Sequence, residues 1–304
     1  LENDNNIGFA GGHNKLYSKS KTEYTLILNQ DIYLQDDCLE KMVEFMDKNS
    51  STASASPRLM RWDFKILDRS NEDVEDRFNR RILELSFSNK IDSLGLKISR
   101  NKRVVEIGSG QNWNINAKSG NAYMRSIQGA DSSEVFGVSG ACAILRKSII
   151  DRLVYLGGFL FDENYDSYKE DVDLSYRIQI SGFQSRIVMD ALAYHDRTAV
   201  GVKKKSDWAA IKNKTKQTEW LKYNSYKNHL ATLYKNFYWQ NFLLDFPWTF
   251  WYEFKKFVYY LFFDKEVLFG LKELWNEHKD LKKKRKFITK IRKISWKELR
   301  SWWN

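Results

Sequence analysis

A short apolar run that ends abruptly in polar residues stands near the start of the chain. Residues 24–28 (YTLIL) are apolar apart from a tyrosine and a threonine, and Asn29, Gln30 and Asp31 follow directly. This pattern is typical of a buried parallel strand whose carboxyl end is polar. Ligands bind at such strand ends in open α/β sheets, so this strand end is a candidate binding position.

Apolar runs and polar breaks continue to alternate along the chain and indicate an α/β fold. Asp36 and Asp37 precede a helical pattern over residues 38–48, with the apolar positions on one face. Further runs predict the following elements in chain order: a strand and turn over 53–60, a charged excursion over 61–100, a strand with a glycine-centred bend over 136–145, a helix over 148–156, and strands over 185–189 and 191–195.

Residues 159–177 (FLFDENYDSYKEDVDLSYR) concentrate six carboxylates before an apolar periodic segment. Helical spacing begins near Asp171, which places Glu170 and Asp171 in the cap or first turn of a helix. Unpaired N–H groups and the helix dipole stabilise ionised carboxylates there. A carboxylate held rigidly at such a boundary can act as a general base toward a hydroxyl. Capping and solvating acids are the alternative interpretation, and the local pattern does not separate the two.

Two other features admit both a binding and a structural interpretation. Gly8, Gly11 and Gly12 lie in NNIGFAGGHN, residues 5–14. They permit close backbone approach to a ligand, but a glycine cluster is also typical of a simple turn. His195 ends the last predicted strand, where several strand ends can converge. It can bind a divalent metal together with an aspartate from another strand end, or it can be a buried structural histidine.

Composition limits the class of protein. The chain has 304 residues with 42% hydrophobic content, enough for one large core or for one core with an appendage. Its two cysteines, Cys38 and Cys142, form no CxxC or disulfide-framework pattern, which suits a reducing compartment and argues against a structural zinc site. No signal peptide opens the sequence, and it begins at Leu1 rather than methionine. We therefore expect a fragment whose true N-terminus is missing.

The formal net charge of +11 is unevenly distributed. Residues 203–304 hold 24 Lys+Arg against 10 Asp+Glu, whereas residues 1–202 hold 26 against 29. Of the 46 aromatic residues, 26 also fall after residue 202. We therefore expect two regions, a first domain over 1–202 and a helical, basic, aromatic-rich region over 203–304.

Aromatic residues are dense over 237–263, but Asp245, Glu253, Lys255 and Lys256 interrupt each apolar run. Every run stays short of the roughly 18 residues that suggest a spanning helix. Aromatics with lysines on amphipathic helices are typical of a membrane interface, where each basic residue near an anionic surface contributes about 1 kcal/mol. Helices that pack their aromatics on the first domain are the alternative. Such a surface also attracts nucleic acid, but no nucleic-acid motif is present, and we expect no nucleic-acid partner.

Several stretches together resemble the family 2 glycosyltransferases of GT-A fold, particularly the rhamnosyltransferase-like branch. They occur in the order of that family, over roughly residues 3–240. The segments are NIGFAGGHN, the strand ending in LNQD, IDSLGLKISRN, FGVSGACAILRKS, FDENYDSYKEDVDLSYRIQISGF, ALAYH and YNSYKNHLATLYKN. The resemblance implies a Rossmann-like mixed sheet flanked by helices, with the C-terminal region as a helical appendage.

The resemblance also implies donor and metal residues. The LNQD segment stands where the family has its DxD-type motif, so Asp31 is expected to bind a divalent metal that holds the donor diphosphate. Asn29 is expected near the donor ribose, and Asn14 among the donor-binding residues. Gly140, in the VSGA turn, is expected beside the donor sugar. His195, at the family's histidine position, is expected to be a second metal ligand.

The catalytic roles follow from the same resemblance. Asp171, the second acid of the ED pair, is expected to deprotonate the acceptor hydroxyl, with Glu170 supporting the orientation of the acceptor or the base. Asp173 and Arg177 are expected to form a structural ion pair. The chemistry agrees, because an inverting displacement needs one base and no carboxylate nucleophile, while a metal neutralises the charge on the leaving diphosphate. Mg²⁺ and Mn²⁺ both suit oxygen ligands, and an imidazole ligand favours Mn²⁺.

The implied function is inverting transfer of a sugar in bacterial cell-surface polysaccharide synthesis, at the cytoplasmic face of the cell membrane. The expected donor is a nucleotide sugar, with dTDP-rhamnose as the best candidate, and the expected acceptor is a lipid-linked molecule or a glycan. Two departures favour the alternative of a catalytically silent relative that serves as a membrane-bound partner. Asn29 replaces the usual first acid of the DxD motif, and the first βαβ portion of the family is absent from this sequence.

Overall fold

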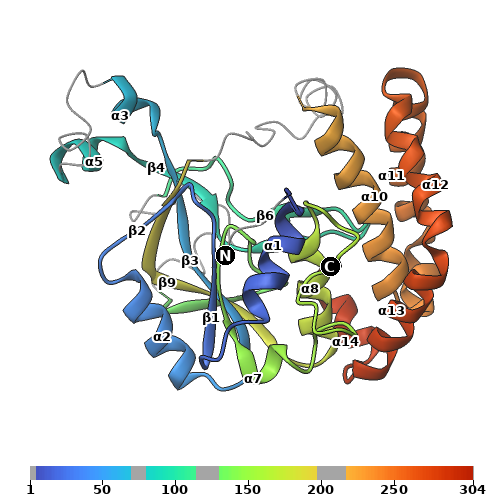
Figure 1. Ribbon diagram of the computed structural model, residues 1–304, viewed down its shortest axis with the longest axis horizontal. Coiled ribbons are helices and arrows are strands. Elements are labelled where there is room, and N and C mark those ends of the chain that lie inside the picture. The colour runs from blue at the N-terminus through green and yellow to red at the C-terminus, as the bar shows by residue number, and fades with distance from the viewer. Residues whose placement is uncertain (1–4, 70–79, 114–129, 197–216, 304) are drawn as a thin grey trace.

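A central sheet of seven strands organises the protein (Figure 1). The computed structural model describes residues 5–69, 80–113, 130–196 and 217–303. Five strands follow the order β1-β8-β3-β9-β2, while β4 pairs with β3 and β7 pairs with β9. The bounds of these strands are β1 (Tyr24–Leu28), β2 (Ile32–Leu34), β3 (Thr52–Trp62), β4 (Phe87–Ser93), β7 (Ser132–Val135), β8 (Cys142–Arg146) and β9 (Gln184–His195). A separate two-stranded sheet joins β5 (Leu96–Ile98) to β6 (Val104–Glu106).

Helices cover both faces of the sheet. Successive side chains of a strand point to opposite faces, and β8 has apolar side chains on both, so each face is packed against helices. On one face, Ile144 of β8 packs with Met42 and Met46 of α2. On the other, Leu145 packs with residues of α1 and α8. The helices of this part of the chain are α1 (Gly8–Tyr17), α2 (Cys38–Lys48), α3 (Lys65–Arg69), α5 (Arg80–Ser86), α7 (Lys147–Ile150) and α8 (Glu170–Ile180). The predicted α/β architecture, a mixed sheet flanked by helices, is confirmed.

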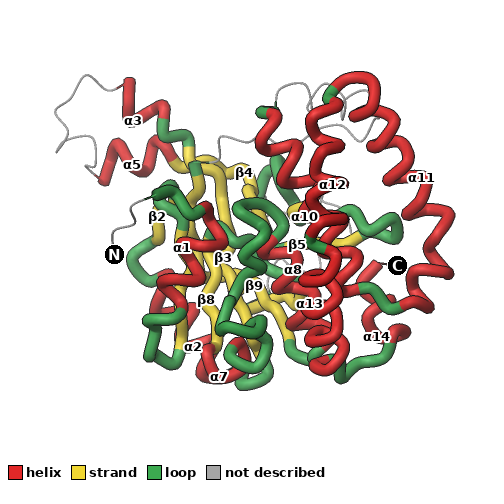
Figure 2. Tube along the Cα trace, turned by 45° about the vertical axis from the view of Figure 1, so that its right-hand side comes forward, coloured by secondary structure: helices red, strands yellow, loops and turns green. Residues whose placement is uncertain are grey.

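The C-terminal region is helical, as predicted, and lies beside α8 and the loops that precede it (Figure 2). The elements are α10 (Glu219–Asn236), α11 (Trp239–Phe263), η1 (Lys265–Leu268), α12 (Phe269–Asn276), α13 (His278–Ile291), α14 (Trp296–Arg300) and η2 (Ser301–Trp303). None of the helices in the described ranges is both long and apolar enough to cross a membrane. The domain boundary predicted at residues 202 and 203 lies outside the described residues.

Several local predictions were wrong. Strand β1 is antiparallel to β8, whereas we predicted a parallel strand. Residues 61–100 were expected to form an excursion, yet β3 continues to Trp62, and β4 and β5 lie within that range. The glycine cluster is neither a turn nor a loop, because Gly8 begins α1. The strand predicted over 136–145 occupies Cys142–Arg146, the helix after it ends at Ile150, and the two strands predicted at 185–195 are one strand, β9.

Candidate active site

The edge of the sheet brings two predicted metal ligands together. Asp31 lies between β1 and β2, and Ile32 of β2 pairs with His195, the last residue of β9. The backbone N–H of Asp196 donates to the carbonyl of Asp31 at 3.0 Å. This pairing places Nε2 of His195 3.4 Å from Oδ1 of Asp31. The strand ladder therefore joins two residues that are 164 positions apart in the chain.

A second carboxylate, Asp92, lies within hydrogen-bond distance of the imidazole of His195. Oδ2 of Asp92 lies 2.8 Å from Nδ1 of His195, and the Asp92 side chain is 1% exposed. Asp92 lies in β4 between Ile91 and Ser93, where the register with β3 shifts. Sequence reasoning assigned no role to Asp92, although its segment IDSLG was among those that resembled the family.

These residues fit a divalent cation. Oδ1 of Asp31 is a buried atom with no hydrogen-bond partner among the described residues, while Nε2 of His195 faces it. A histidine that binds a metal through one nitrogen is commonly oriented by a carboxylate on the other, which is the arrangement of Asp92 and His195. Within the described residues, no three His, Cys, Asp or Glu side chains converge on one point. Among the described residues, Asp31 and His195 are thus the two candidate ligands, and a cation held by them would take its remaining ligands from oxygen atoms of a substrate or water.

Asp171 lies at the start of α8, where two backbone N–H groups hold its carboxylate. Oδ2 accepts from the N–H of Gly140 at 3.3 Å, and Oδ1 accepts from the N–H of Val172 at 2.7 Å. A Cβ atom on Gly140 would lie 3.4 Å from Cβ of Asp171 and 3.7 Å from the ring of Phe9. These are ordinary van der Waals distances, so a small free space remains beside Asp171 at Gly140. A cavity of about 10 Å³ lies there, lined by Ser139, Gly140 and Asp171 and otherwise mainly by apolar core residues.

Glu170, the neighbour of Asp171, is buried and has a different charge state. Burial and the adjacent charge of Asp171 raise the pKa of Glu170 to about 8. Its Oε2 atom is buried without a hydrogen-bond partner among the described residues. The raised pKa keeps a proton on Glu170 at neutral pH, and two neighbouring carboxyl groups whose environments differ can serve as acid and base.

The backbone that leads into Asp171 is strained. Asp166, Tyr168 and Lys169 have φ angles of 23°, 72° and 75°, a region that non-glycine residues rarely adopt. Such strain persists only where surrounding contacts impose it. The contact here is Asn228 of α10, whose Nδ2 donates to the carbonyls of Ser167 and Tyr168 at 2.9 and 2.8 Å. Asn228 was quoted for the resemblance without a role, and no local signal distinguishes it from the other polar residues of that helix.

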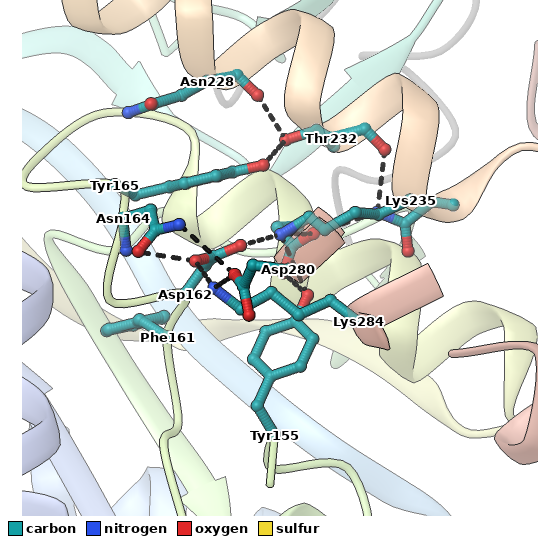
Figure 3. A network of polar contacts seen from close by, with 12 residues as sticks. Tyr155, Phe161, Asp162, Asn164, Tyr165, Asn228, Thr232, Lys235, Asp280 and Lys284 are labelled. Carbon is teal, nitrogen blue, oxygen red and sulfur yellow. Dashed lines mark hydrogen bonds and ion pairs between the residues drawn. The ribbon is translucent and has the colours of Figure 1, made fainter. Parts of the chain in front are cut away.

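A network of buried charges fixes the same segment (Figure 3). Lys235 of α10 and Lys284 of α13 both pair with Asp162. Burial alone would raise the pKa of Asp162, but the charges of the two lysines hold it below its usual value. Asp173 and Arg177 form the predicted ion pair, with Nε and Oδ2 3.2 Å apart and both side chains fully buried. The C-terminal helices are thus built into the wall of the site.

The two remaining predicted donor residues have different surroundings. The backbone N–H of Asn29 donates to the carbonyl of Ala141 at 2.9 Å, beside Gly140. The amide of Asn14 is buried and pairs with both the carbonyl and the N–H of Phe161 at 3.0 and 2.8 Å. Asn14 therefore ties α1 to the loop before α8. Its donor-binding role stays a prediction, and its contacts in this structure are structural ones.

The candidate base and the candidate metal ligands are linked through one stretch of backbone. The N–H of Asn29 donates to Ala141, and the N–H of Gly140, the residue before Ala141, donates to Asp171. Asp31 is two residues from Asn29, which limits their Cα separation to about 7.6 Å. The arrangement therefore links a carboxylate, Asp171, through Gly140 and Ala141 to the strand end that carries Asp31, one of a pair of groups suited to a cation.

Comparisons with known proteins bear on this arrangement. Residues 1–154 match the family described as Glycosyl transferase family 2. No curated protein matched the chain. Among solved structures, a crystal structure of GalNAc-T7 with UDP, GalNAc and Mn²⁺ is similar, with a TM-score of 0.47 and 10% identity over 77% of this chain and 36% of that one. That likeness is too distant to assign a residue. The family match ends before Glu170, Asp171 and His195, whose interpretation depends on the contacts above.

Proposed function

Because the chain belongs to glycosyl transferase family 2, we propose that it moves a sugar from a nucleotide-sugar donor to a hydroxyl group of an acceptor with inversion at the sugar carbon. The supporting observation is the carboxylate of Asp171, held by two N–H groups beside the open position at Gly140. An inverting displacement needs one base on the face opposite the leaving group. Asp171 is the base in this proposal.

Three features of the structure support Asp171 as the proton acceptor. The N–H groups of Gly140 and Val172 stabilise its ionised form. The neutral carboxyl of Glu170 adds no second negative charge beside it at neutral pH. The rigid turn held by Asn228 fixes the direction of the carboxylate, so that an acceptor hydroxyl at Gly140 meets it in one geometry. Preorganisation of this kind lowers the activation barrier, because the entropy cost of orienting the reacting groups has already been met.

Asp31 and His195 would hold a divalent metal, Mn²⁺ or Mg²⁺, and Asp92 would orient His195. Such an ion acts as a Lewis acid that neutralises the negative charge on the departing diphosphate. In the proposal Asn29 contacts the ribose of the donor, and Gly140 lies beside the donor sugar. Asn14 acts indirectly, because its amide holds the loop at Phe161.

We extend the proposal to the reactants and the setting. The donor is a nucleotide sugar, with dTDP-rhamnose as the first to test, and the acceptor is a lipid-linked molecule or a glycan of bacterial cell-surface polysaccharide. Residues 1–202 form the glycosyltransferase domain, and residues 203–304 form a helical, basic, aromatic-rich region at the cytoplasmic face of the membrane. The sequence resemblance and the uneven charge of the two regions support these assignments.

The test is turnover of the full chain with Mn²⁺ and a panel of sugar nucleotides, measured as release of nucleoside diphosphate. Asp171→Asn should lower kcat by about 10²–10⁴-fold, the usual contribution of a general base, while donor binding measured by calorimetry stays unchanged. Asp37→Asn, an exposed carboxylate at the start of α2, is the matched control. Full turnover in Asp171→Asn would remove the base assignment. Donor binding without turnover in the unmodified chain would favour the silent relative, for which Asn29 in place of an acid is the motivating observation.

A further inference from the structure

Helix α11 has its polar side chains on the inside and its apolar side chains on the outside. Asn241, Asp245 and Thr249 are buried at 1%, 0% and 7% exposure, and Glu253 continues the same spacing of four, which places all of them on one face of the helix. Most of the large apolar residues of the helix point outward, although Tyr259 and Tyr260 near its end are buried. The exposed ones are Trp239, Phe242, Leu243, Leu244, Phe246, Trp248, Phe250, Trp251, Phe254, Phe257, Leu261, Phe262 and Phe263.

Ion pairs fix this orientation. Asp245 binds Arg100, Lys102 and Arg300 at 2.9, 2.7 and 2.8 Å, and Lys102 is fully buried. About two helical turns after Asp245, Glu253 accepts a hydrogen bond from His229 of α10 at 2.8 Å. Rotation of the helix to cover its aromatic face would leave buried cations without partners, at a cost of several kcal/mol. The outward position of the aromatic residues is therefore part of the fold.

The exposed face is far larger than an ordinary surface patch. Helix α11 has 25 residues and is therefore about 37 Å long. Soluble monomers rarely expose a contiguous apolar patch above a few hundred Å². A whole aromatic side chain has about 150–250 Å² of surface, and the outward residues of α11 are between 37% and 73% exposed, so together they exceed that size. A face of this length and composition is typical of contact with an apolar phase.

The charges around this face indicate which kind of apolar surface it would contact. Both acids of α11, Asp245 and Glu253, point inward and are paired. At the edge of the apolar face, a hollow is lined by Trp248, Trp251 and Lys255, together with Asn101, Pro247 and Tyr252. The guanidinium of Arg100 lies 3.3 Å above the ring of Trp248 and is 42% exposed. The rim is thus cationic, and the exposed side of the helix carries no carboxylate.

We propose that α11 lies in the plane of an anionic lipid bilayer, with its aromatic face at the boundary of the acyl chains and the cationic rim at the lipid phosphates. No helix in the described ranges is suited to cross the bilayer, and an in-plane helix with aromatics on one face and bases at its edge is the usual form of interfacial attachment. A second copy of this chain fits less well, because pairing two such faces would bring two cationic rims together. The inference names the membrane-contacting element of the proposed function, but it does not depend on catalysis.

The experiment is cosedimentation of the full chain with vesicles of phosphatidylcholine alone and with 30% phosphatidylglycerol. We expect binding to the anionic vesicles that weakens at high salt, and weak binding to neutral ones. The triple variant Phe250→Ser, Trp251→Ser, Phe254→Ser should lose binding at least tenfold. Lys255→Ala should weaken binding to anionic vesicles about fivefold, the effect of one basic residue near a charged surface.

The matched control replaces exposed apolar residues outside the C-terminal helices by serine. Leu85 and Leu156 are 68% and 76% exposed and lie outside the C-terminal helices, so Leu85→Ser with Leu156→Ser should leave vesicle binding unchanged. Far-UV circular dichroism of the triple variant should match the parent, because the altered side chains face outward. Unchanged vesicle binding in the folded triple variant would overturn the proposal. A lipid-free dimer in sedimentation velocity that the triple variant abolishes would also overturn it, in favour of a second copy.

The two proposals fail separately. Vesicle binding is measured without a sugar nucleotide, and release of nucleoside diphosphate is measured with a soluble acceptor. Loss of turnover with intact vesicle binding would count against the catalytic proposal alone, whereas turnover without vesicle binding would count against the membrane contact alone.

Discussion

Helices α10 and α11 follow one another in the chain and both turn polar side chains toward the protein, yet their opposite faces differ. Residues of α10 bind the segment before Asp171, as Asn228 does at Tyr168 and Lys235 does at Asp162. The inward polar residues of α11 bind charges from other parts of the fold, such as Lys102, and its outward face is apolar. Helix α10 thus serves the active site, whereas α11 presents a surface.

The contrast shows that hydropathy does not decide which side of a helix is buried. In α11 the acids Asp245 and Glu253 face inward to charged or polar partners, while most of the large aromatic residues are left outside. Burial of Asp245 is tolerated because three cations and the indole of Trp303 surround it. Paired charges can be buried in this way, whereas an unpaired one cannot. The two helices can be told apart experimentally by changing one inward and one outward position.

The largest expected effect comes from removing an inward charge. Lys235→Met on α10 leaves Asp162 and Asp173 buried with one cation fewer, and we expect a loss of about 3–5 kcal/mol in the free energy of unfolding, measured by urea denaturation. Phe250→Ser on α11 changes an outward residue that is 52% exposed, and its effect should stay within about 0.5 kcal/mol. Equal losses in the two variants would contradict the inverted orientation of α11.

The next effect concerns catalysis. Asn228→Ala removes the two hydrogen bonds that hold the strained turn before Asp171, so the carboxylate loses its fixed direction. We expect kcat to fall by about 10²-fold, the cost of a misplacement near 1 Å, with little change in the KM for the donor. The measurement is steady-state release of nucleoside diphosphate.

Two further variants separate positioning from general stability. Glu219→Gln, an exposed change in the first turn of the same helix, should keep full kcat. Asn228→Gln retains the amide and should recover part of the rate if the longer side chain reaches either carbonyl. Should Asn228→Ala lower thermal stability while kcat of the folded enzyme stays at the parent value, Asn228 would have only a structural role.

A smaller effect on activity is expected at the proposed metal site. Its residues His195 and Asp92 belong to strands of the sheet, whereas Asn228 belongs to α10. Asp92→Asn weakens the hydrogen bond between residue 92 and Nδ1 of His195. Loss of such an orienting carboxylate typically lowers metal affinity 10–100-fold. Titration of activity with Mn²⁺ should therefore show a raised half-saturation concentration and recovery at high Mn²⁺. The same titration of Asn228→Ala should show the parent half-saturation concentration, because that residue contacts only the base side.

Much of the sheet and part of the site could be predicted from the sequence. The apolar run at 24–28 and the helix over 38–48 have the predicted bounds, and Asp31 and His195 were recognised as residues at strand ends. Asp92 was not, because it lies at a register shift in a segment that lacks clear periodicity. Asn228 could not be identified either, since its partners are carbonyl groups about 60 residues away.

The orientation of α11 had a local signal that composition concealed. The polar residues Asn241, Asp245, Thr249 and Glu253 recur every four positions among the aromatics, which is the spacing of a single helical face. That spacing identifies a polar stripe, but whether the stripe faces water or the protein depends on partners from elsewhere in the chain. Those partners, Lys102 foremost, come from a loop between two short strands, and only the folded structure brings them to the helix.

The smallest effect is a pH dependence at the seam between the two helices. Burial lowers the pKa of His229 to about 4, against the opposing effect of Glu253, to which His229 is hydrogen-bonded. The folded state then binds fewer protons than the unfolded state between about pH 4 and 6.5, the ordinary pKa of histidine, so stability decreases as pH falls through that window. Between pH 7 and 5.5 the loss should be on the order of 1 kcal/mol.

Glu170 gives a slope of the opposite sign, which allows a sharper design. Burial and Asp171 raise its pKa to about 8 from the ordinary glutamate value of 4.5. The folded state therefore binds more protons than the unfolded state between pH 4.5 and 8, and stability falls as pH rises through that window. His229→Gln should therefore flatten the acid side of the urea-unfolding profile, and Glu170→Gln should flatten the neutral and alkaline side. If His229→Gln kept the full acid slope, the contact between α10 and α11 would not be the neutral imidazole beside the ionised Glu253 carboxylate seen here, and the fixed orientation of α11 would depend on Asp245 alone.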